Sequence, residues 1–182
     1  MVQQTLVNGV DVEKLKEMAG ELKAKPELAK FHFRVENTWL NAGHSRTTIT
    51  DFYGVGEQIA HDEAFVLDAD EPHVLLSDDE GPNPVEHLLN ALVSCLTGAL
   101  VYHAAIRGIH LEEVESTVEG DIDVRGFMGV SDEVRKGYQN IKVTFRVKTD
   151  APEEKLQECA RFSPVFDVVT HGTEVDLQFE RK

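Results

Sequence analysis

The feature that most constrains this chain is a long uncharged segment near its middle. From Leu88 to Ile106 the sequence LLNALVSCLTGALVYHAAI contains no charged side chain, and this length just reaches that of a membrane-spanning helix. Polar side chains are nevertheless scattered around such a helix, at Asn90, Ser94, Thr97, Tyr102 and His103. Lipid would meet some of them on any face. We therefore expect no membrane span but a buried helix of a soluble protein, covered in part by a second subunit.

Both ends of this helix carry start and stop signals. Asn83 is a good N-cap, Pro84 suits the first helical position, and Glu86 completes a capping box. Gly108 is a typical residue to follow the last helical turn. The sequence therefore predicts a helix from Pro84 to about Arg107.

Strand patterns flank this helix on both sides. Strands are expected over 31–40, 44–55, 64–67, 139–149 and 174–179, and a strand or hairpin over 112–126. Apolar residues alternate with polar ones most clearly over 31–40, 112–126 and 139–149. Shorter amphipathic helices are expected over 11–25 and over 152–162, the second capped by Asp150. A loop is expected over 77–83. This order predicts an α+β fold with antiparallel sheets.

The charge balance and the motif content exclude several classes of function. The chain has 18 Lys and Arg against 33 Asp and Glu, a net charge of −15, so nucleic acid is not an expected partner. The eight histidines show no HxH, HxxxH or HExxH spacing, and no phosphate-binding loop occurs, so neither a metal nor a cofactor is expected. Residues 1–5 do not begin a secretory signal, which makes the reducing cytoplasm the expected location and leaves both thiols free.

Two cysteines are the residues that could carry chemistry. Cys95 lies near the middle of the uncharged helix, where Leu92 and Tyr102 share or flank its face. Its simplest interpretation is a small apolar core residue, because reactivity would need a cation from elsewhere in the fold. Cys159 is the inward residue of an amphipathic helix, and Ser163 is the expected N-cap of the turn that Pro164 begins.

The segment GPNPVEHLLNALVSCLTGAL (81–100) adds a family resemblance. A turn, Asn-Pro, Leu-Leu and then Cys inside a long helix resembles the OsmC/Ohr family, as do RGI (107–109) and FSPVFDVVTHGTEVDL (162–177). The resemblance covers roughly residues 31–180. It implies an OsmC-like fold, with antiparallel sheets around a long central helix, in an intertwined homodimer with its sites at the subunit interface. Residues 1–30 would then be an N-terminal helical extension and 31–182 the OsmC-like domain.

The resemblance also implies a chemistry. In peroxidase members of the family the central-helix cysteine reduces organic hydroperoxides or hydrogen peroxide, and this position is Cys95 here. An arginine from the N-terminal strands holds the thiolate. Arg46 is the expected equivalent, with Arg34 as a rival. The implied partners are a small-molecule peroxide, a thiol reductant and a second copy of the chain.

Two family positions differ in this sequence. Ser163 stands where the family has a second, resolving cysteine before Pro-Val, and Val85 stands where Ohr members have a glutamate. Glu86 cannot replace that glutamate within one subunit, because it lies about 180° around the helix from Cys95. Cys159 is one turn before Ser163, a displacement of about 6 Å, and could resolve Cys95 only if its helix moved.

Two functions therefore stay open from the sequence. The first is a thiol-dependent hydroperoxide reductase that uses Cys95, Arg46 and Cys159, with Ser163, Leu92 and Tyr102 lining the substrate site. The second is a non-catalytic OsmC-like dimer that binds a small apolar ligand or senses redox state. The two departures from the family pattern favour the second function, and the motif around Cys95 favours the first.

Overall fold

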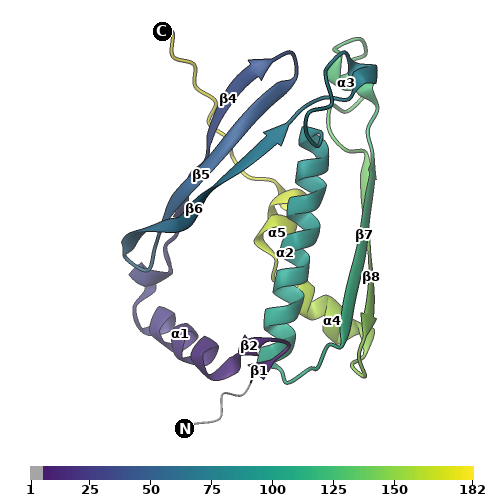
Figure 1. The fold of residues 1–182 in the computed structure, drawn as a ribbon. Coiled ribbons are helices and arrows are strands. Elements are labelled where there is room, and N and C mark those ends of the chain that lie inside the picture. The colour runs from purple at the N-terminus through teal and green to yellow at the C-terminus, as the bar shows by residue number, and fades with distance from the viewer. Residues whose placement is uncertain (1–5) are drawn as a thin grey trace. The chain divides into compact units, whose positions relative to one another are not determined.

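The computed structural model describes residues 6–182 (Figure 1). Residues 1–5, which bear on the expected absence of a secretory signal, lie outside the described residues. The described chain divides into two compact units. The first contains residues 11–88, and the second contains residues 6–10 together with 89–182.

The first unit begins with helix α1 (Val12–Ala24), which confirms the helix expected over 11–25. Asp11 caps it, because its side chain accepts a hydrogen bond from the backbone N–H of Lys14. Pro26 then begins the short 3₁₀ helix η1 (Pro26–Ala29). A second 3₁₀ helix, η2 (His73–Leu75), lies later in the same unit.

The first unit also contains an antiparallel sheet built around β5. Its strands are β3 (His32–Phe33), β4 (Glu36–Asn41), β5 (His44–Gly54) and β6 (Glu57–Ala69). Strand β5 pairs with each of the other three. The strand expected over 31–40 is therefore two short strands, and the one expected over 64–67 is the end of the much longer β6. The register places Arg46 opposite Asp68.

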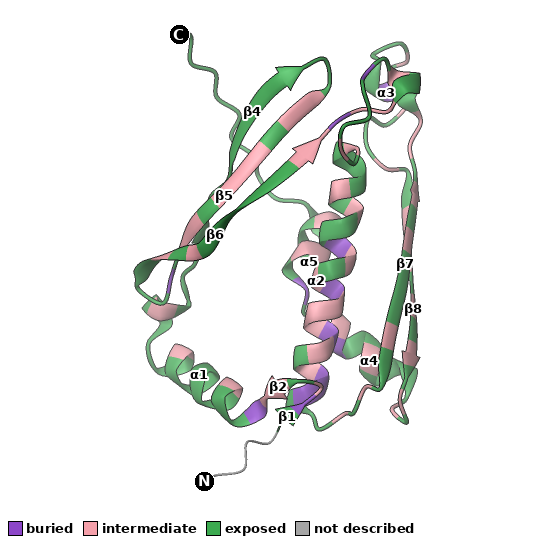
Figure 2. Ribbon diagram, in the orientation of Figure 1, coloured by how far each residue is buried: buried purple, intermediate pink, exposed green. Residues whose placement is uncertain are grey.

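The second unit contains most of helix α2 and a long β-hairpin. Its elements are α2 (Pro84–Ile106), β7 (Glu113–Asp121), α3 (Val124–Phe127), β8 (Asn140–Lys148), α4 (Glu153–Ala160) and α5 (Pro164–His171). The first residues of α2, up to Leu88, belong to the first unit. Strands β7 and β8 pair antiparallel from Glu113 opposite Lys148 to Asp121 opposite Asn140. The core of this unit forms around three buried residues, Leu100, Ala104 and Cys159. Figure 2 shows buried positions, in purple, along α2.

A small hairpin that the sequence analysis did not predict joins the second unit. Strands β1 (Leu6–Val7) and β2 (Val10–Asp11) meet at Asn8 and Gly9, which have φ values of 53° and 79°. Asn-Gly is the pair that favours this tight turn. The Asn8 amide donates to the carbonyl of Ile109 at 2.9 Å, and its oxygen accepts from the N–H of Leu111 at 2.9 Å. These bonds hold the chain directly after α2.

Three local predictions are wrong. Residues 174–179 form no strand in the described chain, because no neighbouring strand edge pairs with them. Asp150 does not cap α4, which begins after Pro152 with no side-chain cap. The strand or hairpin expected over 112–126 is a single shorter strand: β7 ends at Asp121, and Asp123 instead caps α3.

Helix α2 is unusually apolar for its exposure. An 18-residue window has a mean hydropathy of 1.5, yet only 28% of that window is buried within the chain. By length and composition alone, such a helix could cross a membrane. Its buried residues are Leu92, Leu96, Leu100, Ala104 and Ala105. The first four lie within about 120° around the helix, and Ala105 lies about 100° beyond Ala104.

Candidate functional site

The capping residues fix where α2 begins and therefore where Cys95 lies along it. The backbone N–H of Asn83 donates to the Glu86 carboxylate at 2.9 Å, and the N–H of Val85 donates to the Asn83 side chain at 3.0 Å. This confirms the expected capping box. At the other end, Gly108 has a φ of 68°, as a helix stop requires.

Cys95 lies at the border between the buried and exposed sides of α2. Leu92 and Leu96 are buried, with 2% and 5% of their surface exposed, whereas Tyr102 is 52% exposed. At about 100° per residue, Cys95 is roughly 60° from Leu92 and roughly 20° from Tyr102 around the helix. Cys95 itself is half-buried. The thiol is therefore not sealed in the core of its own chain.

Cys159, in contrast, is fully buried. It packs against Leu100 and Ala104 in the core of the second unit. Burial raises the pKa of the Cys159 thiol, although the nearby charge of Arg107 opposes this effect. A thiol with a raised pKa is a poor nucleophile at neutral pH.

The two thiols do not share a side of α2. Leu100 and Ala104, which Cys159 contacts, lie about 140° and about 180° around the helix from Cys95. A disulfide requires Cα atoms within about 7 Å and side chains that point toward each other. Within one chain, the structure does not bring Cys95 and Cys159 together in this way.

Ser163 is a structural cap, as the sequence predicts. Its hydroxyl accepts a hydrogen bond from the N–H of Phe166 at 3.0 Å, and Pro164 occupies the first position of α5. Only 1% of the Ser163 surface is exposed. The residue at the position of the family's second cysteine is therefore buried and already engaged.

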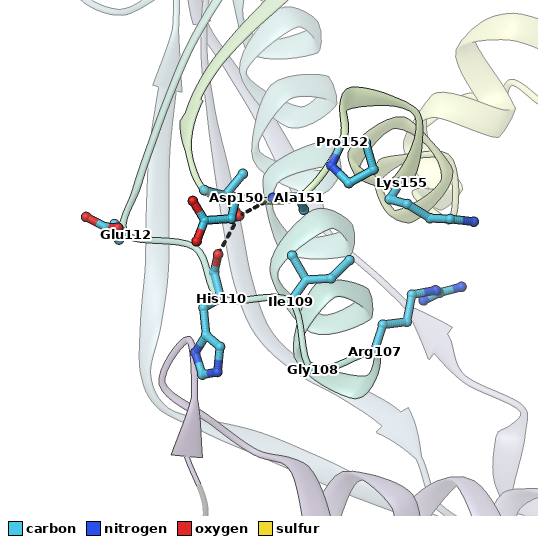
Figure 3. Close-up of a pocket in the computed structure, with 10 residues that line it drawn as sticks. Arg107, Gly108, Ile109, His110, Glu112, Asp150, Ala151, Pro152 and Lys155 are labelled. Carbon is cyan, nitrogen blue, oxygen red and sulfur yellow. Dashed lines mark hydrogen bonds between the residues drawn. The ribbon is translucent and has the colours of Figure 1, made fainter.

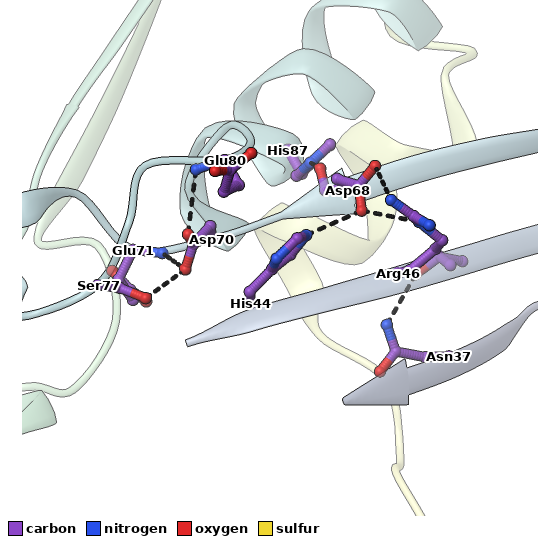
Figure 4. A network of polar contacts seen from close by, with 10 residues as sticks. Asn37, His44, Arg46, Asp68, Asp70, Glu71, Ser77, Glu80 and His87 are labelled. Carbon is purple, nitrogen blue, oxygen red and sulfur yellow. Dashed lines mark hydrogen bonds and ion pairs between the residues drawn. The ribbon is translucent and has the colours of Figure 1, made fainter. Parts of the chain in front are cut away.

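Arg46 belongs to a polar network across β5 and β6 in the first unit (Figure 4). Its guanidinium donates to both carboxylate oxygens of Asp68, at 2.9 and 3.2 Å, and His44 Nε2 donates to the same carboxylate at 2.9 Å. The hydrogen bond from Arg46, and then that from His44, lowers the pKa of Asp68. A bidentate pair of this kind fixes the plane of the guanidinium. The rival Arg34 instead forms a longer, exposed ion pair with Glu36 at 3.7 Å.

The next residues along the chain hold a second carboxylate. Asp70 is fully buried and accepts hydrogen bonds from the Ser77 hydroxyl and from the N–H groups of Glu71 and Glu80. These bonds, led by the one from Ser77, lower the pKa of Asp70 to about 2. Three donors to one buried carboxylate indicate that Asp70 organises the loop before α2. Sequence reasoning missed this role, because an acidic residue before a polar loop is not distinctive.

A cavity of about 660 Å³ lies where α2 ends and α4 begins (Figure 3). Its charged lining residues include Arg107 and Lys155. Arg107 already donates to the carbonyl of His103 at 2.9 Å and lies 5.4 Å from the centre of the Phe162 ring. Lys155 pairs with Glu158 at 2.9 Å. Neither cysteine lines this cavity, so it is not the thiol site that the sequence predicts.

Comparison with known proteins identifies the fold. Three solved structures have similar folds. An OsmC-like protein from Mycoplasma pneumoniae is 16% identical, with 76% of this chain and 87% of that one covered and a TM-score of 0.53. An OsmC-like protein from Vibrio cholerae is 13% identical, with 75% of this chain and 92% of that one covered and a TM-score of 0.51, and an organic hydroperoxide resistance protein OsmC from Legionella pneumophila is 19% identical, with 77% and 90% covered and a TM-score of 0.51. No curated protein matches the chain.

The family model for OsmC-like proteins matches residues 77–178, which is more than half of the chain. This match covers α2 and the elements that follow it, and the solved structures share the α+β fold with antiparallel sheets and a long central helix. It makes α2 the core helix of a soluble protein rather than a membrane span. The chain is therefore a member of the OsmC-like protein family, which includes hydroperoxide resistance proteins.

Proposed function

We propose that this protein is a thiol-dependent hydroperoxide reductase whose peroxidatic residue is Cys95. The observation that carries this proposal is the position of Cys95 in the central helix of an OsmC-like fold, half-buried rather than sealed in the core. The organic hydroperoxide resistance protein from Legionella pneumophila has a similar fold. Cysteine peroxidases need a thiol that is sheltered but reachable, because the thiolate must meet the peroxide.

The proposed reaction is a two-electron oxidation of the thiol. The Cys95 thiolate attacks the distal oxygen of the hydroperoxide, a sulfur–oxygen bond forms, and the oxygen–oxygen bond breaks. The departing alkoxide takes up a proton and leaves as an alcohol, and Cys95 becomes a sulfenic acid. Leu92, Tyr102 and Ser163 are proposed to lie around the substrate, with Tyr102 contributing the exposed apolar surface.

Arg46 is proposed to stabilise the Cys95 thiolate. A cation close to a thiol favours its charged form and lowers its pKa. Asp68 would orient the guanidinium through the bidentate contact, with His44 on the same carboxylate. Arg46 is half-exposed, so part of its guanidinium is open to a second anion.

An external thiol is proposed to restore Cys95. A first thiol condenses with the sulfenic acid, releasing water and forming a mixed disulfide, and a second thiol then releases the free Cys95. Cys159 lies on the other side of α2 within the chain and is buried, so it could act as resolving thiol only if α4 moved. Free thiols of this kind fit a reducing cytoplasm, the proposed location.

We also propose that the working form is a homodimer. Most of the apolar window of α2 is unburied in the single chain, and the exposed residues on the side that carries Cys95 include Tyr102 and Ile106, at 52% and 40%. An apolar face of this length is typical of a subunit interface. Residues 31–182 would form the OsmC-like domain of each subunit and residues 1–30 an N-terminal extension.

The experiment follows consumption of an organic hydroperoxide in the presence of a dithiol. Wild type, Cys95→Ser and the matched control Cys159→Ala are compared at equal concentration. We expect Cys95→Ser to lose the enzymatic rate and Cys159→Ala to retain most of it. Equal rates for wild type and Cys95→Ser would refute the assignment.

A second function, a non-catalytic dimer that binds a small apolar ligand or senses redox state, has two observations in its favour. The residue at the family's second cysteine position, Ser163, is a buried helix cap, and Val85 replaces the Ohr glutamate. The rate of Cys95 alkylation against pH discriminates the two functions. A thiol pKa of about 8.5 or higher favours binding alone, and a value clearly below 7 favours catalysis.

A further inference from the structure

The first turns of helix α2 are fixed to the end of strand β6 at Asp68. The ring of His87, which lies beside Asp68 in Figure 4, donates from Nε2 to the backbone carbonyl of Asp68 at 3.0 Å. Just before the helix, Gly81 lies against the same carbonyl, and a Cβ added there would be 2.7 Å from the Asp68 oxygen. Asp68 is therefore held from the side of α2 by a hydrogen bond and by a close contact that only glycine permits.

The side chain of the same residue binds strand β5. The Asp68 carboxylate accepts from Arg46 Nε at 2.9 Å and Nη2 at 3.2 Å, and from His44 Nε2 at 2.9 Å. The side chains of His44 and Asp68 are only 17% and 28% exposed, so water competes weakly for these bonds. Asp68 thus holds Arg46 through its side chain and α2 through its backbone.

The carboxylate on the first turn of α2 is not available to Arg46. Glu86 accepts the N–H of Asn83 at 2.9 Å and belongs to the cap of the helix. Among the residues that the structure describes, Asp68 is the carboxylate that pairs with Arg46. The connection from α2 to Arg46 that the structure shows therefore runs through His87 and Asp68.

This bonding pattern leaves one edge of the guanidinium for another anion. A guanidinium has five N–H donors, and Asp68 binds the Nε and Nη2 groups. A bidentate pair fixes the plane of the guanidinium, so the direction of the Nη1 group is fixed as well. The side chain of Arg46 is 50% exposed. Cys95 lies eight residues beyond His87, roughly two turns farther along α2.

We propose that Asp68 and His87 are positioning residues, which hold Arg46 in a fixed place relative to the start of the helix that carries Cys95. His44 supports them by sharing the Asp68 carboxylate. A charged group acts most strongly on a reacting atom when it is already oriented, and a displacement of about 1 Å can cost on the order of a hundredfold in rate. This inference rests on the proposed hydroperoxide reduction and extends it to residues that act only through Arg46.

The test asks whether Asp68 and His87 act through Arg46. The kcat/KM for an organic hydroperoxide is measured for Asp68→Asn and His87→Phe, each in the wild-type and in the Arg46→Ala background. In the wild-type background we expect Asp68→Asn to lower kcat/KM at least about tenfold and His87→Phe at least about threefold. In the Arg46→Ala background we expect neither to lower it further, because the interaction that each supports is already lost.

Two matched variants control for the loss of a carboxylate or of a histidine bond elsewhere in the same unit. Asp51→Asn removes a carboxylate of β5 that binds the amide of Gln58. His73→Phe removes a ring that also bonds to a backbone carbonyl, that of Ser77. Neither bond involves Asp68, so we expect both variants to keep the kcat/KM of wild type.

A spectroscopic measurement reports on Arg46 without turnover. In isotope-labelled protein, the Nε–H of Arg46 is expected to exchange slowly with water in wild type, because Asp68 binds it, and rapidly in Asp68→Asn. The conservative variant His87→Gln can still donate to the Asp68 carbonyl. We expect it to recover most of the kcat/KM that His87→Phe loses.

Losses of kcat/KM that simply add to that of Arg46→Ala overturn the proposal, because they indicate general structural damage. An Arg46 Nε–H that exchanges equally fast in wild type and Asp68→Asn also overturns it. If Arg46→Ala keeps the wild-type rate while Cys95→Ser loses it, the positioning role is refuted and the peroxidase assignment stands. If Cys95→Ser reacts as fast as wild type, the proposed function is refuted and this inference falls with it. Should Asp68→Asn fail to fold, His87→Phe and His87→Gln carry the same test.

Discussion

Replacing Ser163 with alanine removes the hydroxyl that begins α5. This hydroxyl accepts the N–H of Phe166 at 3.0 Å, and Ser163 is 1% exposed, so water cannot readily replace it. Loss of a helix N-cap costs about 0.5–2 kcal/mol, and an unsatisfied buried donor costs about 1–3 kcal/mol. Both values describe the same lost bond, so we expect a free energy of unfolding lower by about 1–2 kcal/mol.

That loss corresponds to a measurable change in melting temperature. For a chain of this size, 1 kcal/mol shifts Tm by about 2–4 °C, so Ser163→Ala is expected to melt roughly 2–8 °C below wild type. Ser163→Thr keeps the hydroxyl and serves as the matched control, with a smaller loss. Protein concentration is held constant, because the Tm of a dimer depends on it. An unchanged Tm for Ser163→Ala would refute the assignment of Ser163 as a buried cap.

Three further predictions concern individual side chains. Because the pKa of Asp70 is lowered to about 2, its carboxylate stabilises the fold above about pH 4, and this contribution is lost as the pH falls toward 2. The amount by which Asp70→Asn lowers Tm should therefore be largest at pH 7 and should shrink in acid. A Tm difference that does not change with pH contradicts this. Arg46→Ala should lower kcat/KM for hydroperoxide at least about tenfold. It should change Tm little, because the ion pair of Arg46 with Asp68 is half-exposed. An unchanged kcat/KM contradicts the proposed stabilisation of the Cys95 thiolate by Arg46. A thiol-reactive dye should label Cys95 quickly in the native protein and Cys159 only after unfolding, since Cys159 has no exposed surface, and rapid labelling of both would contradict its burial.

The sequence alone predicts the elements whose signals are local. The capping residues at Asn83 and Glu86 place the start of α2, and Gly108 places its end within about a residue. The alternation over 139–149 predicts β8, because a strand with one buried face must alternate. These features depend on contacts between residues near one another in the chain.

The features that the sequence misses depend on distant partners. Arg46 meets Asp68 through the register of β5 and β6, which a bulge between Ile49 and Asp51 shifts, and no local pattern encodes that shift. The alternation over 174–179 predicts a strand, but a strand also needs a partner, and no strand of the described chain pairs with these residues. Packing likewise decides that Cys159 faces Leu100 rather than the side of α2 that carries Cys95.

The proposed peroxidase role rests on the reactivity of the Cys95 thiol, and one rate measures it directly. The reduced protein is mixed with an organic hydroperoxide, the sulfenic acid is trapped with a dione reagent, and the modified Cys95 peptide is quantified by mass spectrometry over time. We predict a second-order rate constant on the order of a hundredfold or more above that of free cysteine at the same pH, because an activated thiol is ionised and oriented. A rate equal to that of free cysteine would contradict a peroxidatic role for Cys95.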